Sequence, residues 1–315
     1  MTGLIGLVTG ARSGNVLGFG VHTGLQGTSV DDLRELWRHI EEAGFGWISI
    51  WDHFYAADAT GSAQCLEAVA MHAALAESTR SVRCGSLVYS VGYRHPAVLA
   101  NTMATLDQLS NGRITLGLGA GWHQVEYDAY GIPFPPAPIR LKQLEEGIQC
   151  VRGLLMEESV DFTGAHFHLR AARCEPKPVQ HRLPIWIGGG GEKVTMRIAA
   201  QYADGWNVPF VSADEFKRKV GVLNDHCERV SRDPSALTKA VNVGIGANLD
   251  ELESQFGAMA NFIKGGSITG SVDEMTSRVG AYRDAGAEWI ILAARAPFPT
   301  ETMERFAAEV MPSFR

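Results

Sequence analysis

Two stretches near opposite ends of the chain repeat one pattern: Glu42-Ala43-Gly44-Phe45-Gly46-Trp47-Ile48 and Asp284-Ala285-Gly286-Ala287-Glu288-Trp289-Ile290. In each, a stripe of apolar residues at helical spacing ends at a glycine, and an apolar strand follows. The predicted elements are helices over residues 30–43 and 272–285 and strands over 47–51 and 289–292. This repetition predicts a fold assembled from successive helix–strand units.

The same alternation fills the chain between these two units. Further strands are predicted at residues 17–22, 83–88, 114–118, 184–188, 205–208 and 239–245, and further helices at 64–77, 96–109, 140–155, 192–202 and 214–231. Eight strands that alternate with helices call for a parallel sheet covered by helices. Eight repeats favour a closed (β/α)8 TIM barrel, an α/β fold, over an open sheet.

The barrel is predicted to be a single domain over residues 17–315, preceded by an N-terminal extension over 1–16. Residues 156–183 carry several prolines and no helical pattern. We therefore expect an insertion at about 156–183, at the rim of the active site.

Composition excludes several classes of protein. The 315 residues are 45% hydrophobic and carry a net charge of −7 with no long run of one sign, which gives no support for binding to nucleic acid. No apolar stretch approaches the roughly 20 residues that span a membrane. Five scattered cysteines without a C-x-x-C pair indicate neither a disulfide framework nor a zinc site. A cytoplasmic protein is expected.

Four consecutive glycines, Gly188, Gly189, Gly190 and Gly191, separate the predicted strand 184–188 from the predicted helix 192–202. Glycine backbone lets N–H groups approach a ligand, and the amino end of a helix favours negative charge. A flexible linker is the alternative, but linkers rarely join an apolar strand to an amphipathic helix. The run predicts a cradle for a phosphate.

Catalytic groups of such a barrel project from the carboxyl ends of its strands. Asp52 and His53 follow the second strand, and histidine titrates near neutrality, so it suits proton transfer. A hydrogen-bonded structural pair is the alternative for these two residues. His22, at the end of the first strand, either faces the site or is structural.

The fourth strand runs into Gly117-Leu118-Gly119-Ala120-Gly121-Trp122-His123, followed by Glu126. The alternating glycines would let a ligand approach the backbone, and His123 and Glu126 are spaced to share a helical face. Histidines and carboxylates show no recognisable metal-ligand spacing, and no G-x-S-x-G elbow occurs, so neither metal nor acyl-enzyme chemistry is expected.

Several blocks in combination resemble the luciferase-like monooxygenase superfamily, and within it the branch that uses the deazaflavin coenzyme F420. They are Trp51-Asp52-His53-Phe54, Arg94-His95-Pro96, residues 106–113, residues 116–122, Ile187 with the four glycines, and residues 202–207. The resemblance covers residues 17–311 and implies a (β/α)8 barrel with an insertion. It agrees with the fold expected from the alternation.

By this resemblance, residues 188–191 bind the coenzyme phosphate, and Ala120 and Gly121 line the pocket of the deazaflavin ring. Asp52 would contact the ring, and His53 would handle a proton near its reactive carbon. The implied reaction is hydride transfer between F420 and a small organic substrate.

The family also implies a non-proline cis peptide against the ring, expected here at Ser86–Leu87. One departure concerns Trp122, which stands where the sugar-phosphate dehydrogenases of the family have a glutamate. Glu126 is the nearest substitute for that proton-transferring group, with His123 as a second candidate. Oxidation of sugar phosphates is therefore not expected.

Two alternatives remain open. One is an FMN-dependent monooxygenase that activates oxygen on the same fold, and the other is a non-catalytic flavin-binding protein. Aromatic residues near the predicted site, such as Trp51 and Tyr127, suggest a partly apolar or planar substrate, although core packing explains them nearly as well. A homodimer is expected by default for such barrels.

Overall fold

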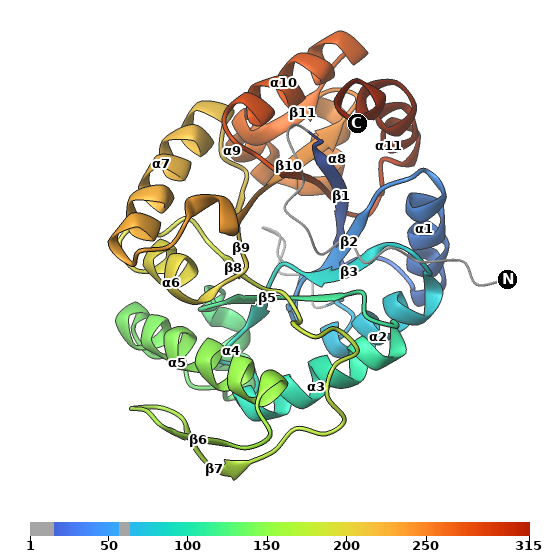
Figure 1. Ribbon diagram of the computed structural model, residues 1–315. Coiled ribbons are helices and arrows are strands. Elements are labelled where there is room, and N and C mark those ends of the chain that lie inside the picture. The colour runs from blue at the N-terminus through green and yellow to red at the C-terminus, as the bar shows by residue number, and fades with distance from the viewer. Residues whose placement is uncertain (1–15, 57–63) are drawn as a thin grey trace, which may run out of the picture.

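The computed structural model describes residues 16–56 and 64–315, which form a closed parallel barrel (Figure 1). In these ranges the eight barrel strands are β1 (Gly18–Thr23), β2 (Trp47–Ile50), β3 (Arg83–Ser86), β5 (Ile114–Gly119), β8 (Ile185–Gly188), β9 (Gly205–Pro209), β10 (Thr238–Gly246) and β12 (Trp289–Ala294). They pair in this order, and β12 pairs with β1 to close the ring. The predicted TIM barrel is confirmed.

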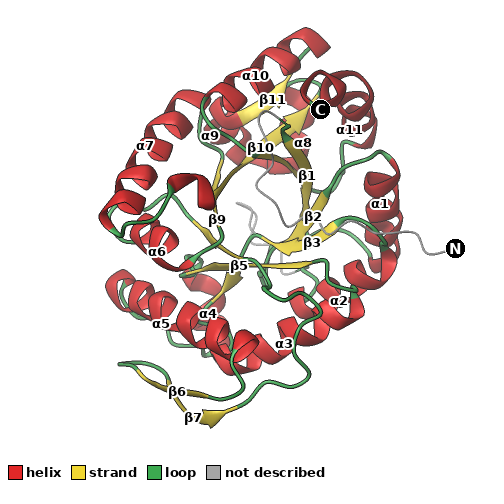
Figure 2. Ribbon diagram, in the orientation of Figure 1, coloured by secondary structure: helices red, strands yellow, loops and turns green. Residues whose placement is uncertain are grey.

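Seven predicted helices surround the strands (Figure 2): α1 (Val30–Glu42), α2 (Ala68–Ser78), α3 (Pro96–Leu109), α5 (Ala137–Met156), α6 (Thr195–Tyr202), α7 (Ala213–Arg229) and α10 (Val272–Asp284). Capping boxes start the two helices of the opening repeat, with Ser29 at the N-cap of α1 and Ser271 at that of α10. Each serine accepts a backbone N–H that the first helical turn leaves unpaired. Helix α6 begins three residues later than expected.

Several short elements were not predicted. The helices are α4 (Gln124–Tyr130), α8 (Leu249–Phe256), α9 (Ala260–Ile263), α11 (Thr300–Arg305) and the single turns η1 (Pro234–Ala236), η2 (Gly257–Met259), η3 (Lys264–Gly266), η4 (Phe306–Val310) and η5 (Met311–Phe314). The strands are β4 (Tyr89–Ser90), β6 (Val160–Thr163), β7 (His168–Ala172) and β11 (Ser267–Thr269). Most are too short for hydrophobic periodicity to reveal.

The insertion at residues 156–183 contains the β6–β7 hairpin, which lies outside the ring of helices beside α5 (Figure 1). The buried Glu146 carboxylate of α5 accepts backbone N–H groups from Ala165, His166 and Phe167 and so fastens the hairpin to that helix. No residue of 156–183 lines the cavity at the carboxyl end of the barrel. The expectation that the insertion forms the active-site rim was wrong.

Three indole rings fill the interior of the barrel toward its amino end, and we call Trp47, Trp186 and Trp289 the tryptophan layer. Trp47 stacks on Trp186 with ring centroids 4.6 Å apart and lies 5.8 Å from Trp289. Glycines on neighbouring strands make room: a Cβ at Gly20 would approach the Cβ of Trp47 to 2.7 Å, and one at Gly85 would overlap its ring. Replacing a buried tryptophan by alanine typically costs about 3–5 kcal/mol.

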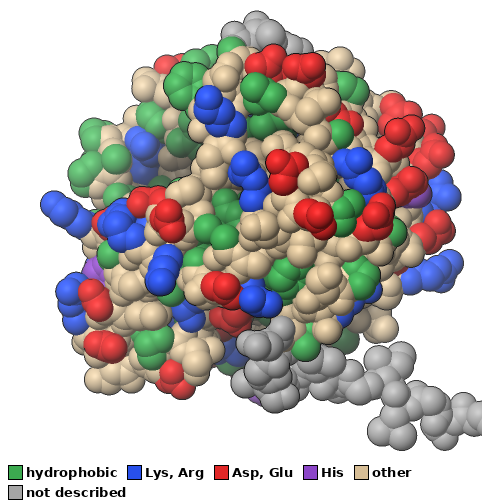
Figure 3. Space-filling model, turned by 90° about the horizontal axis from the view of Figure 1, so that it is seen from above, with side chains coloured by type: hydrophobic (Ala, Val, Ile, Leu, Met, Phe, Trp, Pro, Cys, Tyr) green, Lys and Arg blue, Asp and Glu red, His purple; other side chains and the backbone are tan. Residues whose placement is uncertain are grey.

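The surface carries basic and acidic side chains interspersed on the face shown in Figure 3. None of the described helices is both long and apolar enough to cross a bilayer. All five cysteines are free thiols, and four of them are buried. The expected N-terminal extension, except for its last residue, lies outside the described residues.

Candidate active site at the carboxyl end of the barrel

A cavity of about 460 Å³ opens at the carboxyl ends of the barrel strands. Its volume is typical of a site for a small molecule or cofactor. Residues singled out from the sequence line it, namely His22, Asp52, His53, Leu87, Ala120, Gly121, His123, Gly188 and Gly189. A larger hollow of about 720 Å³ lies at the opposite mouth. We place the chemistry in the smaller one, because TIM barrels carry their active sites at the carboxyl end.

Leu87 and Val88 reach the cavity wall from the bulge that follows β3, and both pack with the tryptophan layer. The peptide between them is cis, one residue later than the predicted Ser86–Leu87. Ser86 is still in register with β2, opposite Ile50, and its hydroxyl is held by Gly117. The bulge therefore starts after Ser86, which is buried and is not among the residues that line the cavity.

Glycines around the bulge make room for it. A Cβ at Gly119 or at Gly188 would come within 2.6 Å of a Val88 methyl group. A Cβ at Gly117 would overlap the carbonyl oxygen of Ser86. Gly117 and Gly119 are therefore needed to accommodate the protein's own backbone and side chains. Gly119 and Gly121 also line the cavity, where a ligand could approach them.

The four-glycine run divides into two parts. Gly188 and Gly189 line the cavity together with Thr195, the first residue of α6. Gly190 and Gly191 are not on the cavity wall, and their carbonyls accept hydrogen bonds from the Lys219 amino group and the Met196 N–H. Gly189 has φ +126°, which disfavours any residue with a side chain. The part of the run that a ligand can reach is its first half.

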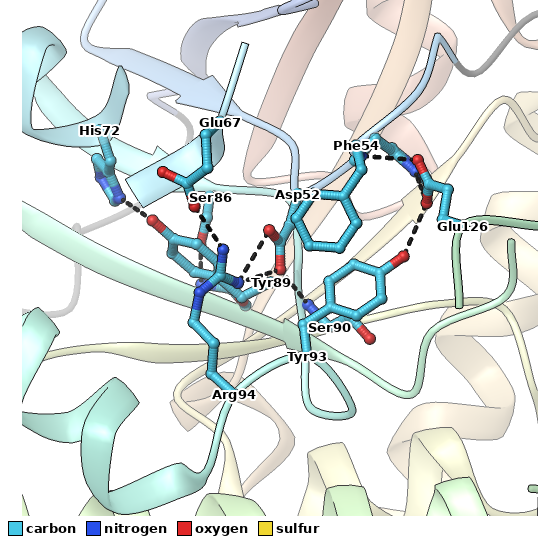
Figure 4. Close-up of polar contacts among 12 residues, drawn as sticks. Asp52, Phe54, Glu67, His72, Ser86, Tyr89, Ser90, Tyr93, Arg94 and Glu126 are labelled. Carbon is cyan, nitrogen blue, oxygen red and sulfur yellow. Dashed lines mark hydrogen bonds and ion pairs between the residues drawn. The ribbon is translucent and has the colours of Figure 1, made fainter. Parts of the chain in front are cut away.

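Asp52 lines the cavity but its carboxylate is fully engaged (Figure 4). Arg94 donates to both oxygens at 2.9 and 2.7 Å, and the Ser90 N–H donates at 3.0 Å. Arg94 also pairs with Glu67. Burial raises the pKa of Asp52, and Arg94 acts against this rise. Since a guanidinium keeps its proton and Nη1 of Arg94 donates to both carboxylate oxygens, we regard the pair as ionised.

His53 lies on the cavity wall, and its Nδ1 is 2.9 Å from Oε2 of Glu126. Glu126 also accepts the hydroxyl of Tyr93 at 2.7 Å and the N–H groups of Phe54 and Tyr55, each at 2.8 Å (Figure 4). One carboxylate therefore fixes both the His53 ring and the backbone of the loop that carries it.

The Glu126 side chain is wholly buried and does not reach the cavity. Burial by itself raises the pKa of this carboxyl, but hydrogen bonds from His53, Tyr55 and Tyr93 outweigh it and lower the pKa to about 2. An ionised Glu126 accepts the Nδ1–H of His53, which leaves Nε2 as the acceptor on that ring. The expected substitute proton donor is placed to orient His53 instead.

His123 approaches the same carboxylate oxygen as His53, with its Nδ1 3.4 Å from Oε2 of Glu126 and its ring centre 5.7 Å from that of His53. Ligand atoms of His53, His123 and Glu126 lie within 4.8 Å of one another, the one such group of three among the described residues. Sequence spacing did not reveal this group because His53 is far from the other two residues in the chain. Trp122, 64% exposed, stacks on His123 at the cavity wall.

His22 is buried, with its Nδ1 3.0 Å from the Ser49 hydroxyl. Burial, assisted by the nearby charge of Arg295, lowers its pKa to about 3, so it is uncharged at neutral pH. Arg295 was missed from the sequence although it directly follows the last barrel strand. Its guanidinium lies 4.9 Å from the ring centre of Trp51.

Comparisons with known proteins agree with this geometry. The family model described as luciferase-like monooxygenase matches residues 12–288. An F420-dependent glucose-6-phosphate dehydrogenase of Amycolatopsis mediterranei is 34% identical over 176 residues, which is 56% of this chain and about half, 52%, of the relative. The enzyme of the same name from Intrasporangium calvum is 26% identical over 90% of this chain and 95% of its own length.

A solved structure has the same fold over nearly its whole length. An F420-dependent secondary alcohol dehydrogenase in complex with an F420-acetone adduct superposes with a TM-score of 0.86 and 22% identity, covering 95% of this chain and 99% of that one. The residues that match the family model run from before β1 to Glu288, which immediately precedes β12, the last barrel strand. The chain therefore belongs to the luciferase-like monooxygenase family.

Proposed function

We propose that this protein is an F420-dependent oxidoreductase that transfers a hydride between the deazaflavin coenzyme and a small organic substrate. The observation that carries the proposal is His53, held on the cavity wall by a buried carboxylate beside the Leu87–Val88 bulge. Relatives named F420-dependent glucose-6-phosphate dehydrogenase support the choice of coenzyme, and one of them aligns over 90% of this chain.

The described residues fit such a coenzyme. Ala120, Gly121 and the Leu87–Val88 bulge offer a small, largely apolar surface for a flat ring beside Asp52 and His53. A Cβ at Gly189 would meet only a Thr195 methyl group, at 3.4 Å, so this part of the cavity wall is uncrowded. Gly188, Gly189 and Thr195 would border the phosphate, with the Thr195 hydroxyl as a donor, because the Gly189 N–H already donates to the Asn207 carbonyl. Gly190 and Gly191 lie off the cavity wall.

When bound, the coenzyme supplies the carbon that accepts or donates the hydride. His53 Nε2 would take the proton of a substrate hydroxyl during oxidation and return it to the oxygen during reduction. Glu126 stabilises the positive ring of His53 after the proton arrives, and Asp52 with Arg94 holds the neighbouring loops in place. We therefore assign proton transfer to His53 and positioning to Asp52 and Glu126.

The wider setting is also part of the proposal. We infer one domain over residues 17–315, a cytoplasmic location and a homodimer, with no resident metal and no nucleic-acid partner. The interspersed surface charges support the last point (Figure 3). Size-exclusion chromatography with light scattering tests the dimer directly.

Calorimetric titration of the purified protein with F420 and with FMN tests the choice of coenzyme. We expect saturable binding of F420, with one site per chain, and much weaker binding of FMN. Tight FMN binding without F420 binding would refute the proposal and favour the monooxygenase, whose mark is oxygen consumption coupled to reduced flavin. Coenzyme turnover that is unchanged in His53→Ala would instead favour a non-catalytic binding protein.

A further inference from the structure

One half of the cavity is left for the substrate if the coenzyme extends from the glycines after β8 toward His53 after β2. Strand order in the barrel places β10, β12 and β1 across the mouth from the β5–β8 side. The walls of this substrate half come from the ends of those three strands and the segments that follow them. If the proposed function holds, the side chains of this half indicate what class of substrate the enzyme binds.

Apolar side chains dominate the substrate half. Phe256 and Met259 line it from the segment after β10. Phe210 and Trp51 follow β9 and β2, the two strands that flank this half in the barrel order. Phe256 is 1% exposed and packs edge to face on Phe210. Rings and a thioether in such an enclosure favour burial of hydrocarbon from the substrate.

Two polar groups of this half have protein partners. The Oδ1 of Asn242 accepts a hydrogen bond from the Asn207 amide at 3.0 Å, and His22 pairs with Ser49. A hydroxyl that leaves water without finding a partner costs about 1–3 kcal/mol. A sugar with several hydroxyls would therefore be bound poorly here.

The cation on the described wall of the substrate half is buried against aromatic rings. No lysine lies on the described cavity wall. Arg295 is on the wall, but its guanidinium lies 4.9 Å from the Trp51 ring centre and 4.6 Å from that of Phe256, and the residue is 6% exposed. The imidazole of His22 is uncharged at neutral pH.

We infer that the substrate is an uncharged, largely apolar molecule with one hydrogen-bonding oxygen at the carbon that exchanges the hydride, and not a sugar phosphate. The inference rests on the proposed function and extends it to a substrate class. Its oxygen would face His53 Nε2, and its hydrocarbon would lie against Phe256 and Met259. Oxidation breaks the C–H and O–H bonds of the alcohol: the hydride goes to F420, the proton to His53, and a carbonyl forms.

Binding without turnover tests this substrate class. Saturation-transfer NMR on the F420-loaded protein would use cyclohexanol, 2-octanol and menthol as apolar probes and glucose 6-phosphate as the charged polyol. We expect signal transfer to at least one alcohol and none to the sugar phosphate. Binding of glucose 6-phosphate in preference to all three alcohols would overturn the inference, and so would the absence of binding by every alcohol. Calorimetric binding of F420 to the same preparation separates these results from failure of the proposed function.

Two lysine substitutions on neighbouring turns locate the site. Met259→Lys adds a second cation to the wall, on a flexible side chain, and should weaken alcohol binding about 10-fold while allowing glucose 6-phosphate to bind. Phe262→Lys is the matched control, because Phe262 is 87% exposed and is not on the cavity wall. Met259→Ala keeps the test valid if the lysine variant does not fold. Equal alcohol affinities in wild type, Met259→Ala and Phe262→Lys would contradict this location.

Discussion

Replacing Glu126 with glutamine tests the role of the buried carboxylate that orients His53. Glutamine has the same shape, and its carbonyl oxygen can still accept the N–H groups of Phe54 and Tyr55. Its amide nitrogen then faces the two other donors, His53 Nδ1–H and the Tyr93 hydroxyl. Because the amide N–H2 of glutamine can only donate, His53 Nδ1 must become an acceptor, and the proton of the ring moves to Nε2. In this tautomer Nε2 can no longer accept a proton from the cavity.

The cost to stability follows from the pKa of Glu126. A carboxyl with an ordinary pKa of 4.5 that falls to about 2 in the fold gains about 3 kcal/mol at neutral pH, at about 1.36 kcal/mol for each pH unit. Because the folded pKa is the lower one, this stability is present above pH 4.5 and is lost as the pH falls through 2. The variant should therefore be about 3 kcal/mol less stable at pH 7, and the gap should shrink to about half at pH 3.

Urea unfolding at pH 7 and pH 3 measures the gap, and ¹⁵N NMR of labelled histidine reports the tautomer of His53. Turnover of the variant should fall about 10²- to 10⁴-fold, as expected when a proton-transferring histidine is held in the wrong state. Tyr93→Phe is the matched control, since it removes one donor to Glu126 and leaves the charge. An unchanged tautomer in Glu126→Gln, or a stability gap that does not depend on pH, would refute the reasoning.

Three further substitutions have expected outcomes. His53→Asn should lower turnover about 10²- to 10⁴-fold while the Kd of the coenzyme changes less than about 3-fold, as measured by steady-state kinetics and calorimetry. Gly189→Ala forces a side chain into φ +126° and should weaken coenzyme binding about 10-fold, whereas Gly221→Ala, whose Cβ meets nothing within 4 Å, should not. Arg94→Met leaves the Asp52 carboxylate buried without its main partner and should cost about 3–5 kcal/mol in urea unfolding, with part of the loss recovered by adding Asp52→Asn.

Periodicity and glycine placement were enough to predict the barrel, because each strand and each long helix is amphipathic or buried over many residues. Where side chains rather than the backbone pattern decide, the prediction was less accurate. Sequence spacing placed the cis peptide at Ser86–Leu87, one residue early, because the pairing of Ser86 with β2 is a tertiary contact. The hairpin in residues 156–183 was missed for a similar reason, since the Glu146 carboxylate that fastens it lies on a distant helix turn.

The candidate site was predicted in part. Asp52 and His53 could be selected because functional side chains follow strand ends, and both line the cavity. The same rule applied to the last strand would have selected Arg295. The rule does not predict which side chains will contact one another. Glu126 is spaced to share a helical face with His123, but its shorter contact is with His53, some 70 residues earlier in the chain, and this contact forms only in the folded barrel.

The tryptophan layer constrains how this barrel can evolve. Trp47 occupies the space that side chains at Gly20 and Gly85 would need, and Gly18 and Gly205 face Trp289 and Trp186 in the same way. A mutation of any of these glycines is therefore blocked until the facing indole has become smaller, and a smaller residue there first leaves a void. We therefore expect substitutions of a glycine and of the tryptophan that faces it to be coupled, so that relatives keep both residues or replace both. Since Leu87 and Val88 pack on these rings, such a paired exchange would also be a route by which the active-site cavity is reshaped without any change in the residues that line it.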